Sequence, residues 1–155
     1  MRKIVSTAMV VLGISSLAIS SVARADVTAP EDVKIENLAI SAPLTGTPGS
    51  AEEGKNVFSN RKLGNCLACH ANSDMSDQLF HGEVGPSLDG AGTRWQPELL
   101  RTIVVNAKAV FSDETVMPGF YSLDVGEDVR KDLVGKTILT AQQVEDLVAY
   151  LSTLK

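Results

Sequence analysis

The C-terminal end of the chain has the clearest amphipathic pattern. Apolar residues recur there at three- and four-residue spacing, at Ala141, Val144, Leu147, Val148, Leu151 and Leu154. This period predicts an α-helix with one apolar face, and it places Glu145 and Asp146 on the outer face. Thr140 and Gln143 form a T-x-x-Q capping box, which marks the start of that helix.

A second apolar stripe follows Pro97. Proline suits the first position of a helix, because the N–H group that it lacks has no partner there in any case. The apolar residues at helical spacing are Leu100, Ile103, Val104, Ala107 and Phe111. We therefore expect a second helix with this whole stripe buried.

A third helix is predicted to begin at Ser50. Ser50 and Glu53 match the S-x-x-E capping box. Phe58 then lies on the inner side, and Gly54 lets another helix approach closely. We expect this helix to end within residues 60–64, with Gly64 as its stop, and the C-terminal helix to cross it near Gly54 and Phe58.

Three segments, residues 26–49, 71–92 and 121–139, contain turn-forming residues and show no sustained period. Neither strand alternation nor an internal repeat appears in the 155 residues, so we predict one all-α domain over residues 50–155. Residues 26–49 form an irregular N-terminal arm with spaced apolar residues, namely Val33, Ile35, Leu38, Ile40 and Leu44. Two interpretations stay open for this arm: a disordered leader, or a segment that packs along a partner.

Residues 1–25 have the layout of a secretory signal peptide. A basic start, Arg2 and Lys3, precedes an apolar stretch over residues 4–19 and a small-residue cleavage site at residues 23–25. The alternative is an uncleaved anchor, but the stretch is shorter than the ~20 residues that a membrane span needs. We therefore expect cleavage, export to the periplasm and a mature chain without a membrane span.

The charge balance argues against nucleic acid and anionic membrane surfaces as partners. The full chain has a net charge of −5. Loss of Arg2, Lys3 and Arg24 with the leader leaves 11 basic against 19 acidic residues, a net charge of −8. Phosphate-rich surfaces repel a chain of this charge.

The strongest chemical signal is the pentapeptide Cys66-Leu67-Ala68-Cys69-His70. A C-x-x-C-H run is the attachment motif of c-type haem, in which two thiols bind the porphyrin covalently and the histidine ligates its iron. Three other interpretations are weaker: a redox dithiol, half of a zinc site, or a disulfide. The dithiol motif belongs to a βαβ unit, zinc requires further ligands at finger-like spacing, and a disulfide closing so small a loop stabilises little.

The second axial ligand of such an iron is expected to be Met117, in the loop sequence Met117-Pro118-Gly119-Phe120. A thioether paired with histidine raises the potential of the haem. Met75 follows His70 too closely to reach the opposite haem face. His81 is the remaining competitor, and an open site is the third possibility.

Three further residues are candidates for the haem surroundings. The carbonyl groups around Pro86, in the string Gly85-Pro86-Ser87-Leu88, can accept the outer N–H of His70. Arg94 by its charge and Trp95 by its indole N–H are candidates for haem propionate contacts. Plain packing and an ordinary turn are the alternative interpretations of these residues.

The chain over residues 50–155 resembles a class I cytochrome c, an all-α fold wrapped around one covalent haem. It more narrowly resembles the SoxX family, the monohaem subunits of the SoxAX sulfur-oxidising cytochromes. The strings that carry this resemblance are RKLGNCLACH (61–70), VGPSL (84–88), VNAK (105–108) and LTAQQVED (139–146). Residues 121–139 match the family less clearly.

The resemblance implies a periplasmic heterodimer with a SoxA-type subunit. Such a complex joins thiosulfate oxidatively to a cysteine of the SoxYZ carrier, an L-cysteine S-thiosulfotransferase reaction. SoxX-type subunits accept the released electrons and pass them to a downstream acceptor, so this chain is expected to supply no catalytic nucleophile of its own. The resemblance also implies that Cys66 and Cys69 hold the haem and that His70 and Met117 ligate its iron.

Two other functions stay open at this point. One is a freestanding periplasmic cytochrome that shuttles electrons between other redox proteins. The other is an enzyme or gas sensor with an open iron site, which a Met117 ligand disfavours because it blocks the sixth position.

Overall fold

The computed structural model describes residues 26–124 and 126–155, and the leader lies outside these residues. Its α-helices are α1 (Ala51–Ser59), α2 (Ala91–Arg94), α3 (Pro97–Asn106) and α4 (Ala141–Thr153). Short 3-10 helices are η1 (Pro30–Asp32), η2 (Cys66–Ala68), η3 (Ser73–Met75), η4 (Ala107–Ala109) and η5 (Lys131–Leu133). No strand occurs in the described ranges, where Glu36 and Ala39 form one isolated bridge, so the all-α prediction is confirmed.

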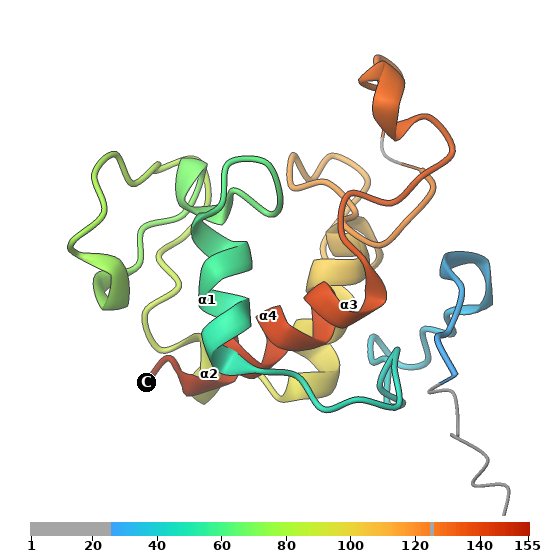
Figure 1. Ribbon diagram of the computed structural model, residues 1–155, viewed down its shortest axis with the longest axis horizontal. Coiled ribbons are helices and arrows are strands. Elements are labelled where there is room, and N and C mark those ends of the chain that lie inside the picture. Colours follow the sequence, from blue (N-terminus) through green and yellow to red (C-terminus); the bar gives the residue numbers. More distant parts are fainter. Residues whose placement is uncertain (1–25, 125) are drawn as a thin grey trace, which may run out of the picture.

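Helix α4 packs against both α1 and α3 and organises the core (Figure 1). Its crossing with α1 is close: a Cβ atom on Gly54 would lie 2.0 Å from the Asp146 carbonyl oxygen and 2.7 Å from Tyr150 Cβ. The Phe58 and Tyr150 rings meet edge to face, with centroids 5.5 Å apart. The predicted crossing at Gly54 and Phe58 is therefore confirmed, and only glycine fits at its centre.

The capping box of α4 is present as predicted, but the expected exposure of its two acidic residues is wrong. Glu145 is 5% exposed and Asp146 is 7% exposed. Glu145 Oε1 accepts from Arg101 Nε at 2.8 Å, and Asp146 Oδ1 accepts from the Ser50 N–H at 2.9 Å. Because each carboxylate has a hydrogen-bond partner from a distant segment, each tolerates burial at a position that helical periodicity assigns to the outer face.

Both ends of α1 differ in detail from the prediction. Ser50 Oγ accepts the Glu53 N–H at 3.3 Å, but the Ser50 N–H donates to Asp146 instead of closing the capping box. The helix ends at Ser59, with Asn60 as its C-cap. Gly64 is thus not the stop; it lies at a close approach, since a Cβ atom there would lie 3.1 Å from Cys66 Sγ.

Helix α3 buries most of its predicted stripe. Leu100, Ile103, Val104 and Ala107 are buried, whereas Phe111 is 58% exposed. The helix ends at Asn106, whose extended backbone (φ −157°, ψ 94°) interrupts the helical period before η4, so Phe111 is no longer in phase with the stripe.

The N-terminal arm packs on its own domain, on the side of α3 and α4 (Figure 1). Ile40 and Leu44 are 3% and 1% exposed. The Leu44 N–H donates to Glu145 Oε1 at 2.9 Å, and the Ile40 carbonyl accepts from Arg101 Nη1 at 2.9 Å. The disordered-leader interpretation is therefore wrong for this part of the arm.

The described residues contain no helix with the length and apolar character required to cross a lipid bilayer.

Candidate haem-binding site

The C-x-x-C-H motif folds as one tight turn between α1 and the long loop that follows. Residues Cys66–Ala68 form η2, which begins after Asn65 in the left-handed region at φ 49°. The N–H groups of Cys69 and His70 both donate to the Cys66 carbonyl, at 3.1 and 2.9 Å. Buried Leu67 anchors the turn in the core. Both thiols and the imidazole are thus presented from one short, fixed segment.

The thiols are free, which argues against the disulfide interpretation. Burial raises the pKa of the Cys66 thiol to about 12. A thiol with so high a pKa is protonated at neutral pH, whereas a redox dithiol depends on a thiolate. The zinc interpretation has no support either, because no group of three or more His, Cys, Asp or Glu side chains in the described ranges has the arrangement to hold a metal.

The imidazole of His70 is oriented by a backbone carbonyl. His70 Nδ1 donates to the Pro86 oxygen at 2.7 Å, which is the kind of contact predicted for this string. This bond fixes the tautomer with its proton on Nδ1 and leaves the lone pair of Nε2 for a metal. Gly85 lies directly against the ring, since a Cβ atom there would lie 2.3 Å from His70 Cε1.

Both ring nitrogens of His81, the competing ligand, form hydrogen bonds with the backbone of its own loop. Its Nδ1 accepts from the Asn72 N–H at 3.3 Å, and its Nε2 donates to the Met75 carbonyl at 3.1 Å. Ligation by either ring nitrogen would break one of these bonds. Met75 is 1% exposed and fills the core, as expected for a methionine that is not a ligand.

Met117 is half-buried in the loop between η4 and the Phe120 region, and it packs against the core cluster. Just after it, the Phe120 N–H donates to the Val104 carbonyl of α3 at 3.1 Å. The Phe120 carbonyl accepts from the Leu139 N–H at 2.9 Å. The loop is therefore connected to α3 and to the segment before α4.

Arg94 braces the loop that carries Pro86, and Trp95 lies beside its guanidinium. Arg94 Nη2 donates to the Ser87 carbonyl at 3.1 Å, Nη1 donates to the Asp89 carbonyl, and the guanidinium lies 4.9 Å from the Trp95 ring centroid. Trp95 is half-buried against the core. Contacts of either residue with haem propionates stay a prediction.

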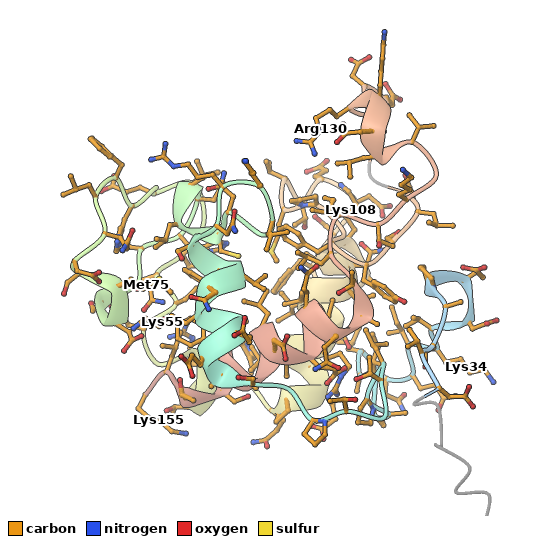
Figure 2. All side chains as sticks on the ribbon, in the orientation of Figure 1. Lys34, Lys55, Met75, Lys108, Arg130 and Lys155 are labelled. Carbon is orange, nitrogen blue, oxygen red and sulfur yellow. The ribbon has the colours of Figure 1, made fainter. Side chains whose placement is uncertain are left out.

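A polar network that sequence reasoning missed clamps the segment after His70 to α1 and α4. Buried Asn72 donates through Nδ2 to the Tyr150 hydroxyl at 2.8 Å, and that hydroxyl donates to Asp74 Oδ2 at 2.9 Å. Lys55 extends from α1 to the same carboxylate at 2.8 Å (Figure 2). Its bond holds the pKa of Asp74 below the usual range, while burial and Asp74 raise the pKa of Tyr150.

The donor set fits a c-type haem. Two free thiols stand at the covalent attachment spacing, beside one imidazole with an available nitrogen and, further along, one half-buried thioether. The motif residues that the sequence predicts for haem binding, Cys66, Cys69 and His70, thus lie on a backbone held by hydrogen bonds. Asn72 and Tyr150 support the backbone that follows His70, and no sequence motif marks them.

Comparisons with known proteins agree with this geometry. Residues 51–155 match the family model described as Cytochrome c. The comparison with curated proteins gave no match. Among solved structures, a chain of the crystal structure of SoxXA from P. pantotrophus is 45% identical, with a TM-score of 0.76, over 83% of this chain and 98% of that chain. The chain therefore belongs to the cytochrome c family, whose members carry covalently bound haem c, and within it is a SoxX-like electron-transfer cytochrome.

Proposed function

We propose that this chain is the monohaem redox subunit of a SoxAX-type complex, with a His/Met-ligated haem. Cys66 and Cys69 attach the haem, and His70 and Met117 ligate its iron. The observation that carries this proposal is the 2.7 Å bond from His70 Nδ1 to the Pro86 carbonyl, because it leaves Nε2 available for the metal. Elimination supports Met117, since His81 has both ring nitrogens engaged and Met75 is buried in the core.

When bound, the haem supplies reversible one-electron chemistry. The chain's own residues set the conditions for it. The Pro86 carbonyl holds the His70 ring in one orientation and raises its basicity as a ligand. A neutral thioether at Met117 favours the reduced state and so raises the potential. Arg94 fixes the loop that carries Pro86 and, with Trp95, is a candidate for the haem surroundings.

The partner is proposed from the comparison, because the structure of SoxXA from P. pantotrophus is a complex. In our proposal a SoxA-type subunit joins thiosulfate to a cysteine of a SoxYZ carrier. This chain takes up the released electrons and passes them to a downstream acceptor. The two cysteines of this chain both belong to the haem motif. The thiol that reacts with thiosulfate in this proposal therefore comes from the partner subunit. Residues 1–25 act as a cleaved signal peptide that directs the chain to the periplasm.

The arm does not decide between a permanent complex and a freestanding shuttle. Its apolar anchors Ile40 and Leu44 are buried against the chain's own domain and are not available to a partner. The identity to the SoxXA chain is what favours the complex.

Export with haem maturation tests the proposal. The full chain carrying a C-terminal tag is expressed in a bacterium with haem c maturation, with and without a SoxA-type subunit. We expect a coloured periplasmic product that begins after residue 25 and exceeds its polypeptide mass by one haem. We also expect co-purification of the two subunits at heterodimer size. A colourless product would refute haem attachment, and a coloured product that elutes alone at monomer size would support the shuttle.

A further inference from the structure

One lysine side chain holds the segment that leads into Met117. Lys108 Nζ donates to the carbonyl oxygen of Asp113 at 2.5 Å and to that of Thr115 at 2.9 Å. Thr115 lies two positions before Met117 in the chain. The ammonium group of Lys108 thus links η4 to the loop that follows it, through two backbone carbonyls. Lys108 is labelled in Figure 2.

Lys108 stands on a fixed base. It lies in η4, directly after α3, and its N–H donates to Asn106 Oδ1 at 3.2 Å. Its neighbour Ala107 is fully buried. The backbone of Lys108 is therefore fixed by the core, while its side chain reaches the carbonyl groups of the exposed turn.

Apolar packing does little for the same segment. Val116, directly before Met117, is 82% exposed, and residues 111–114 are exposed as well. On the far side of Met117, the next fixed point is Phe120, whose N–H donates to the Val104 carbonyl at 3.1 Å. Met117 thus lies on a short bridge between Thr115, held by Lys108, and Phe120, held by α3.

We propose that Lys108 is a positioning residue for Met117. This inference rests on the proposed ligation by Met117. Two hydrogen bonds from a charged donor keep the loop in the conformation that presents the thioether. Without them, a larger fraction of molecules has an open loop, and an external ligand that competes with Met117 binds more tightly in proportion to that fraction.

Imidazole is the probe, titrated into the ferric holoprotein and followed by the haem spectrum. Lys108→Met keeps the length of the side chain and removes its donors. We expect it to lower the apparent dissociation constant of imidazole about tenfold. Lys108→Arg retains donors and should stay much closer to the wild type. Lys131→Met is the matched control, since it removes one exposed lysine from η5, in a different loop (Figure 1).

A double variant separates positioning of Met117 from any other effect. In a Met117→Ala background no thioether competes with imidazole, so Lys108→Met should then change the affinity little. An equal change in both backgrounds, or a Lys108→Met variant that behaves like Lys131→Met, would overturn the inference. Failure of the ligand assignment looks different: Met117→Ala alone would leave both the spectrum and imidazole binding unchanged.

Discussion

The guanidinium of Arg101 and the carboxylate of Glu145 form a buried bidentate pair between α3 and α4. Nε lies 2.8 Å from Oε1 and Nη2 lies 2.9 Å from Oε2, and the side chains are 7% and 6% exposed. The same two groups bond the backbone of Ile40 and Leu44 in the arm. One ion pair therefore connects two helices and the N-terminal arm.

Breaking this pair should destabilise the protein and release the arm. Glu145→Gln leaves the Arg101 charge buried without a counter-charge, for which we expect a loss of about 3–5 kcal/mol in the free energy of unfolding. Urea denaturation measures the loss of stability, and faster hydrogen exchange at the Ile40 and Leu44 N–H groups reports release of the arm. The control is Asp132→Asn, which removes the exposed Arg130–Asp132 pair and should leave the urea midpoint nearly unchanged. Similar midpoints for the two variants would contradict the assigned role of Glu145.

The network around Tyr150 predicts a dependence of stability on pH in the acid range. The Lys55 and Tyr150 bonds lower the pKa of Asp74 in the folded state, so the carboxylate adds stability above its ordinary pKa near 3.8. That stability is lost as the pH falls through the lowered pKa. Because Asp74 is half-exposed, solvent screens much of the effect. Unfolding at several pH values checks this, with Asp74→Asn expected to flatten the curve below pH 4.

Tyr150→Phe tests the buried half of the same network. It leaves the Asn72 side chain, which is fully buried, without its acceptor at 2.8 Å. We expect a loss of about 1–3 kcal/mol in the free energy of unfolding. Since the Phe58 ring contact survives this change, a Tyr150→Leu variant should lose more stability than Tyr150→Phe. Equal losses in the two variants would mean that the ring contact adds nothing, and an unchanged stability in Tyr150→Phe would mean that the hydroxyl contributes nothing.

The parts of the fold that follow from local chemistry were predictable from the sequence. The capping box at Thr140, the close approach at Gly54 and the acceptance of the His70 N–H by the Pro86 carbonyl each depend on neighbouring residues or on a familiar motif. The errors share a different cause. Glu145 is buried because Arg101, 44 positions away, faces it, and a helical period contains no information about such partners.

Met117→Ala should leave the haem attached but lower its potential. In the proposed site, attachment depends on Cys66 and Cys69, so the product should stay coloured, whereas Cys66→Ser or Cys69→Ser should reduce attachment. Loss of a thioether ligand removes its preference for the reduced state, and we expect a drop on the order of 0.1 V or more, within the ≈0.8 V range that axial ligation covers. Redox titration measures the potential. Carbon monoxide should bind the reduced wild type poorly and the variant well; tight binding to the wild type would argue for an open site.

Gly85→Ala is expected to act through His70. A Cβ atom would lie 2.3 Å from Cε1 of the ring, so the ring and the segment with Pro86 must separate. The bond from Nδ1 to the Pro86 carbonyl then weakens, His70 becomes a poorer electron donor to iron, and the potential should rise. This sign is opposite to that of Met117→Ala, so one redox titration distinguishes the two faces of the site. Gly135→Ala is the control. Its left-handed backbone at φ +69° is strained by a side chain, but no atom lies within 4 Å of the added Cβ. It therefore shows the effect of a strained glycine substitution that does not press on His70. An unchanged potential in Gly85→Ala, together with a normal yield of holoprotein, would show that the Pro86 bond does not tune the iron.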